Sequence, residues 1–109
     1  MANPVPLGKI TVVTPGTLVD IWGAAVTAER GQNKMAHNWF VQWVSGTVYV
    51  GRQNLNRTTL ANVYVVLSTS FRSWQPPPIE GSANSFPLDD IRFDADGGGD
   101  SVLFSYVSL

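Results

Sequence analysis

The chain has no cysteine and a single histidine, His37, among its 109 residues. The lack of cysteine excludes a disulfide framework, a thiolate metal site and a cysteine nucleophile. Any catalytic triad or histidine-assisted metal site would have to use His37. We therefore expect packing and assembly to stabilise the chain, and we expect no cofactor.

Long apolar runs and an excess of charge are missing as well. No apolar run approaches the ~20 residues that a membrane-spanning helix requires. Residues 1–8 (MANPVPLG) have neither the basic start nor the apolar stretch of a secretory signal. The net charge is −1, so the basic excess that attracts a phosphate backbone is absent. We expect neither a membrane nor nucleic acid among the partners.

Common enzyme motifs do not occur either. The sequence has no Gly-x-Ser-x-Gly elbow, no phosphate-binding glycine loop and no His-Glu-x-x-His pair. We expect a protein without catalytic activity. A small lyase or hydrolase that uses His37 and the acidic residues is the enzymatic alternative.

Short runs of alternating apolar and polar residues dominate what is present. The runs are rich in β-branched and aromatic side chains and are separated by Gly, Pro, Asn and Asp, which is typical of strands and turns. The expected strands are residues 9–14, 17–22, 38–44, 47–52, 62–67, 71–74, 88–93 and 101–107. About eight short strands in this length predict an all-β protein, a single antiparallel β-sandwich with jelly-roll-like topology.

Neighbouring runs are expected to pair with each other. Residues 38–44 and 47–52 are predicted to form a hairpin across Ser45-Gly46, and the segment 94–100 (DADGGGD) is predicted to close a second one. Residues 62–67, nearly all apolar, are expected to be a central strand with 71–74 beside it. In residues 23–37, Gly31 interrupts the helix-favouring residues, so a loop with at most one helical turn is expected.

Prolines mark two segments that do not fit a sandwich strand. Two prolines in the first eight residues and the run at residues 76–78 favour extended backbone without ladder donors. We expect residues 1–8 to be an extended N-terminal arm and residues 9–109 to be the domain. The arm is either a tail in solvent or lies along a neighbouring subunit. The residues that would make that contact are Pro4, Val5, Pro6 and Leu7.

Charge is unevenly distributed along the chain. Up to residue 79 the net charge is +4, and from Glu80 onward it is −5. The two halves either interleave within one sandwich or dock head-to-tail on a second molecule. The aspartates of residues 94–100 form either a solvated hairpin tip or a cation site, although the spacing does not match a known calcium loop.

Four tryptophans are a high number for this length. Alternation along residues 38–44 places Trp39 and Trp43 on one face of the strand and Phe40 on the other. Because both faces are largely apolar, we expect one to cover the core and the other to meet another subunit. The residues expected at contacts between subunits are Trp39, Phe40, Trp43 and Trp74.

The order of these features resembles small structural proteins of tailed bacteriophages, in particular the decoration or cement proteins of the capsid surface. The resemblance is carried by residues 7–12 (LGKITV), residues 46–51 (GTVYVG), and the acidic, glycine-rich stretch 88–100 that runs into residues 101–107. It implies a non-catalytic jelly-roll-like sandwich, present in many copies and often trimeric, that binds the major capsid protein and fastens neighbouring subunits together.

The resemblance also implies a location on the virion capsid surface, after assembly in the host cytoplasm. The expected function is therefore that of a structural virion protein that stabilises a shell by binding its coat subunits. The alternative is a carbohydrate- or receptor-binding module of a virion fibre or adhesin, since exposed aromatic rings also stack on sugars.

Overall fold

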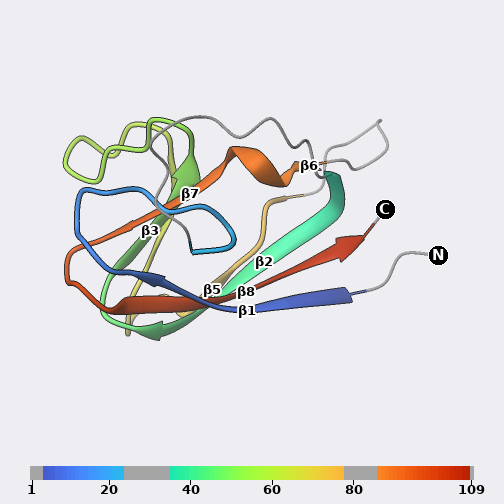
Figure 1. Cartoon of the computed structure of the whole chain (residues 1–109), viewed down its shortest axis with the longest axis horizontal. Helices are drawn as coiled ribbons and strands as arrows, with labels where there is room; N and C mark the ends of the chain where they lie inside the picture. Colours follow the sequence, from blue (N-terminus) through green and yellow to red (C-terminus); the bar gives the residue numbers. More distant parts are fainter. Residues whose placement is uncertain (1–3, 24–34, 78–85, 109) are drawn as a thin grey trace.

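The computed structural model describes residues 4–23, 35–77 and 86–108. Eight strands and one 3-10 turn lie within these residues (Figure 1). The strands are β1 (Pro4–Val12), β2 (Met35–Ser45), β3 (Val48–Arg52), β4 (Val63–Leu67), β5 (Ser73–Trp74), β6 (Phe86–Pro87), β7 (Ile91–Ala95) and β8 (Asp100–Ser108). The 3-10 turn η1 (Leu88–Asp90) occupies the start of a run that was expected to be strand throughout. Within the described residues no helix is long and apolar enough to cross a membrane.

The strands form two antiparallel sheets. The larger sheet has the order β1–β8–β2–β5, with β6 also paired to β2, and the smaller sheet has the order β4–β3–β7. Val19 adds an isolated bridge to Phe93 of β7, with both backbone N–H groups donating across it. The smaller sheet is therefore ordered Val19, β7, β3, β4. This alternation of the chain between two sheets is the jelly-roll order, and the all-β sandwich predicted from the sequence is confirmed.

Both hairpin predictions are wrong, because the two strands of each predicted hairpin lie in opposite sheets. β2 belongs to the larger sheet and β3 to the smaller one, and β7 and β8 are separated in the same way. The expected strand over residues 17–22 is reduced to the bridge at Val19. The expected central strand, β4, is an edge strand that pairs with β3, and β5 lies in the other sheet.

Gly46 carries the chain from one sheet to the other. Its φ of 74° lies in the left-handed region, and a Cβ atom at this position would lie 1.9 Å from Cγ of Asp100. The Asp100 carboxylate is held there because the backbone N–H groups of Gly97 and Thr47 donate to it, at 3.0 and 3.2 Å. A residue without Cβ is therefore required at this crossing.

The proline run explains why β5 is only two residues long. Val41 and Gln42 of β2 pair with Trp74 and Ser73 of β5. Continuing this register would place Pro76 opposite Trp39, and proline has no N–H to donate to the ladder. The proline run therefore ends the strand at the edge of the larger sheet.

The N-terminal arm is a strand from residue 4 onward. β1 pairs with β8 from Pro4 opposite Val107 to Val12 opposite Asp100, with an irregularity between Pro6 and Gly8. Proline is tolerated here because β1 is an edge strand, on which alternate N–H groups face away from the sheet. The predicted boundary between an arm and a domain at residue 8 is therefore corrected for residues 4–8, and residues 1–3 lie outside the described part.

The core lies between the two sheets. Its largest fully buried side chains include Phe93 of β7 and Phe104 of β8, whose rings meet edge to face at 6.0 Å. Ile21, Leu67 and Leu88 are buried with them. Each sheet contributes one large ring to this contact, so the two layers are tied together at their centre.

Candidate functional site

The outer face of β1, β8 and β2 carries apolar side chains that the core does not use. We call this surface the sheet face. Its residues are Pro6, Lys9, Thr11, Asn38, Phe40, Gln42, Leu103, Ser105 and Val107. Val44 lies next to it, at an irregularity where the pairing of β2 with β8 skips one residue. Leu103 lies at its centre, opposite Gln42 on one side and Lys9 on the other. Leu103 is 43% exposed and Val44 38%. Lys9 is the only charged residue that the described parts of these three strands place on the sheet face, since the Asp100 carboxylate is bound at the loop end.

The structure separates the residues predicted at subunit contacts. Trp39 is 2% exposed and belongs to the core, so its prediction as a contact residue is wrong. Phe40, one position later, is half-buried on the sheet face, as the alternation predicted. Both faces of the strand are apolar, and the sequence alone did not show which one points inward.

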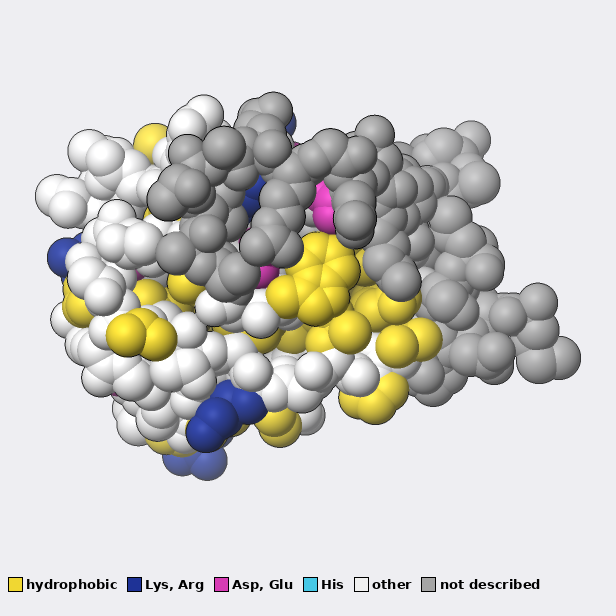
Figure 2. All heavy atoms as spheres, viewed as in Figure 1, with side chains coloured by type: hydrophobic (Ala, Val, Ile, Leu, Met, Phe, Trp, Pro, Cys, Tyr) yellow, Lys and Arg dark blue, Asp and Glu magenta, His cyan; other side chains and the backbone are white. Residues whose placement is uncertain are grey.

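The predicted arm residues are also divided between two environments. Val5 and Leu7 are half-buried and pack against the core, whereas Pro6 is exposed. The backbone of Pro4 lies in β1, and its side chain is outside the described part. Figure 2 shows a patch of hydrophobic side chains near the middle of this view, above the position of β1 in Figure 1 and next to the part that is not described. Trp22, in the segment that follows β1, is 46% exposed.

Trp43 is held by its own chain. Its indole N–H donates to the carbonyl oxygen of Gly46 at 2.7 Å, and the guanidinium of Arg72 lies 5.6 Å from the ring centre. The ring also packs against the core. These contacts fix the end of β2 where the chain changes sheet.

Trp74 belongs to an aromatic cluster at the open side of the sandwich, between the edge strands β4 and β5. Its ring lies 5.4 Å from that of Trp39 and 5.6 Å from that of Tyr64. Trp39 in turn stacks on Phe104 of the core at 5.7 Å. Trp74 also borders a groove of about 510 Å³ lined by Phe40, Val41, Gln42, Ser73, Trp74 and Gln75. The structure therefore brings together two of the predicted contact residues, Phe40 and Trp74.

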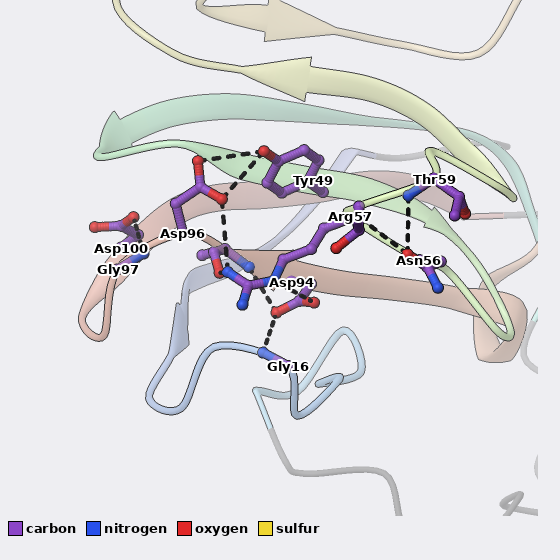
Figure 3. A network of polar contacts seen from close by, with 11 residues as sticks. Gly16, Tyr49, Asn56, Arg57, Thr59, Asp94, Asp96, Gly97 and Asp100 are labelled. Atoms are coloured by element: carbon purple, nitrogen blue, oxygen red, sulfur yellow. Dashed lines mark hydrogen bonds and ion pairs between the residues drawn. The ribbon is translucent and has the colours of Figure 1, made fainter.

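A network of polar contacts joins the loops at one end of the sandwich (Figure 3). Asp94 is 3% exposed; its carboxylate accepts a hydrogen bond from the backbone N–H of Gly16 at 2.8 Å and pairs with Arg57 at 3.7 Å. Arg57 also donates to the carbonyl oxygen of Ala95 at 2.7 Å and lies 3.5 Å from Asp96. One guanidinium thus joins the loop after β3 to two carboxylates of β7 and its turn.

A side-chain cap positions Arg57. The amide oxygen of Asn56 accepts hydrogen bonds from the backbone N–H groups of Thr58 and Thr59, at 2.9 and 3.0 Å. This tight turn is typical of asparagine, and it directs the following arginine toward Asp94. The network is therefore built on local turn chemistry rather than on a regular element.

Tyr49 of β3 closes the other side of the network. Its hydroxyl donates to the Asp96 carboxylate at 3.1 Å. Burial raises the pKa of Tyr49, and the hydrogen bond to Asp96 raises it further. The phenol is therefore held in its neutral, donating form.

These contacts use the aspartates that suggested a cation site. Asp94, Asp96 and Asp100 bind Arg57, Tyr49 and backbone N–H groups, and Asp94 is buried rather than solvated. Among the described residues no group of three or more histidine or acidic side chains is placed to hold a metal ion. The geometry therefore supports a structural role, in which these contacts hold the loops in place relative to one another. The backbone of His37 lies in β2, and its side chain is outside the described part.

The two oppositely charged halves of the sequence interleave. Arg52 and Arg57 come from the basic half and pair with Asp90, Asp94 and Asp96 from the acidic half. The first of the two arrangements considered from the sequence therefore accounts for these pairs.

Neither Leu103 nor Tyr64 was predicted from the sequence as a contact residue. Alternation in β8 places Val102 and Phe104 inward and Leu103 outward, so this signal was available. Tyr64 carried no such signal, because it lies at an irregularity in the pairing of β4 with β3.

Comparison of the chain with protein-family models, with curated proteins and with solved structures found no match. The inferences that follow therefore depend on the residues of this chain and their arrangement.

Proposed function

We propose that this protein is a non-enzymatic structural protein that binds neighbouring proteins through the sheet face. Its proposed setting is a virion, as a decoration protein on the capsid surface that contacts coat subunits and copies of itself. The observation that carries the proposal is the exposure of Leu103 at the centre of an outward sheet face with one charged residue, Lys9.

This surface differs from an ordinary solvated sheet. Antiparallel sheets that face water on one side usually alternate apolar residues inward with polar residues outward. Here Phe40, Leu103 and Val107 interrupt the polar positions of the outer face. An exposed apolar patch with a polar rim is characteristic of protein contact surfaces.

A decoration role fits a weak single contact of this kind. Many copies on a regular shell, each tied to its neighbours, gain effective concentration without strong individual interfaces. The cross-sheet contacts and loop network keep the sandwich rigid, so ordering on binding costs little conformational entropy.

The test is binding to shells that lack the protein. The purified protein is measured by light scattering and then co-sedimented with such shells over a range of salt. We expect association that survives raised salt, because the surface is mainly apolar. We expect Leu103→Asp to abolish it and Ser70→Asp, which adds the same charge in an exposed loop, to leave it unchanged. A monomer that ignores shells, or equal behaviour of the two variants, would contradict the proposal.

A further inference from the structure

The open side of the sandwich between β4 and β5 presents an aromatic ring to solvent. The pairing of β3 with β4 skips Tyr64, since Val50 is opposite Val65 and Gly51 is opposite Val63. Tyr64 lies beside Trp39 and Trp74, with ring centres 6.1 and 5.6 Å away. A bulge of this kind redirects a side chain, and here the Tyr64 ring joins the cluster at the edge of the two layers.

The Tyr64 side chain is partly open to solvent. The Trp74 ring stacks on it with an interplanar angle of 13°. Tyr64 is nevertheless 49% exposed, so about half of its surface is accessible to a ligand. The Trp74 ring in turn packs against the ring of Trp39, which is buried. The exposed ring is therefore a fixed platform rather than a freely rotating side chain.

Two charged groups of opposite sign belong to the neighbouring strand and turn. Arg52 follows Gly51, which pairs with Val63, the residue before Tyr64. Arg52 of β3 and Asp90 of η1 lie 3.6 Å apart, and their side chains are 56% and 26% exposed. Both act on Tyr64: burial raises the pKa of its hydroxyl, the Asp90 charge raises it further and the Arg52 charge lowers it. A partly exposed pair at this distance contributes little to stability, so little is lost if the hydroxyl groups of a ligand replace part of the contact.

We propose that Tyr64, Arg52 and Asp90 form a binding site for a neutral saccharide. The C–H face of a pyranose ring packs on the exposed part of the Tyr64 ring. Arg52 donates to one ring hydroxyl, and Asp90 accepts from the adjacent one. The opposite charges compensate each other, which favours a neutral sugar over an anionic one. This site goes beyond the proposed function, because it lies at the β4–β5 side and shares no residue with the sheet face.

The test is titration of the intact protein with neutral oligosaccharides, selected first on a glycan array. Intrinsic tryptophan fluorescence reports binding, since Trp74 lies behind the platform. We expect Tyr64→Ala and Asp90→Asn each to weaken binding by about tenfold or more. Phe71→Ala is the matched control, because Phe71 is 47% exposed and lies outside the cluster; it should bind as the parent does.

Asp90→Asn keeps the proposal testable if Tyr64→Ala disturbs the cluster, and near-ultraviolet circular dichroism checks the fold of each variant. No array signal for neutral sugars, binding of anionic glycans or proline-rich peptides alone, or equal loss in Phe71→Ala would overturn the site. Leu103→Asp should leave saccharide binding intact while abolishing shell binding. Failure of either proposal is therefore distinguishable from failure of the other.

Discussion

The polar contacts around Asp94, which we call the loop network, differ from the sheet face in whether the side chains have partners within the chain. In the loop network, Asp94, Arg57 and Tyr49 find partners within the chain. On the sheet face, Leu103 remains exposed although it is apolar. The loop network stabilises an isolated molecule, because its contacts hold three loops together. The sheet face is the surface for which we propose a binding partner.

This difference predicts which substitutions change the free energy of unfolding and which change the proposed binding. Substitutions in the loop network are expected to lower the free energy of unfolding and to leave recognition untouched. Substitutions on the sheet face are expected to do the reverse.

Asp94→Ala should destabilise the fold most, by about 2–4 kcal/mol, because it leaves Arg57 and the Gly16 N–H without their buried acceptor. Chemical denaturation measures the change. Asp96→Ala is the control: its side chain is 56% exposed, and a loss below about 1 kcal/mol is expected. Equal losses in the two variants would show that the buried carboxylate has no special role.

Gly46→Ala should cost about 2 kcal/mol, because it adds left-handed strain and a collision with the Asp100 carboxylate. Gly16→Ala separates the two effects. Gly16 has a φ of 89° but open space around the position of a Cβ, so strain alone should cost about 1 kcal/mol. If thermal denaturation gives the same loss for both, the collision is relieved by a small shift of Asp100.

Tyr49→Phe should cost about 0.5–1 kcal/mol at neutral pH by removing the hydrogen bond to Asp96. The folded-state pKa of Tyr49 is raised above its ordinary value of 10.0. Its contribution is therefore complete below pH 10 and is lost as the pH rises through the folded-state pKa. The free energy of unfolding of the parent should fall more steeply in this range than that of the variant. Parallel curves would contradict the assignment.

Leu103→Thr should change the free energy of unfolding by less than about 0.5 kcal/mol, since threonine is well accepted in strands and the side chain is not in the core. The same substitution should weaken association with shells or copies. Val102→Thr, one residue away and fully buried, is the contrasting control and should destabilise the fold. A large stability loss from Leu103→Thr would remove the distinction between the two regions.

The sequence predicted the strands far better than their partners. Alternation located β2, β3 and β8, and a short apolar run located β4, because both are local properties of the sequence. It also led to two hairpins that do not form, because a glycine turn such as Ser45-Gly46 is compatible with a hairpin and with a crossing between sheets. The deciding contact is the approach of Asp100 to Gly46, which joins residues far apart in the chain.

The candidate sites show the same limit. Phe40 was predicted at a contact from strand parity, and the structure places it on the sheet face. Trp39 was assigned to the same role because parity gives two faces without saying which is inside. The platform at Tyr64 depends on a bulge and on the pairing of η1 with β3 side chains, neither of which leaves a pattern in the sequence.

The pairing of Pro4 with Val107 brings the first and last strands together, side by side in one sheet. Any peptide fused before β1 or after β8 would emerge at the same corner of the molecule. A circularly permuted chain, joined there by a short linker and reopened in the exposed turn at Thr58 and Thr59, should keep both sheets. Engineered cargo could thus be attached at either terminus while the opposite end of the sandwich stays unobstructed.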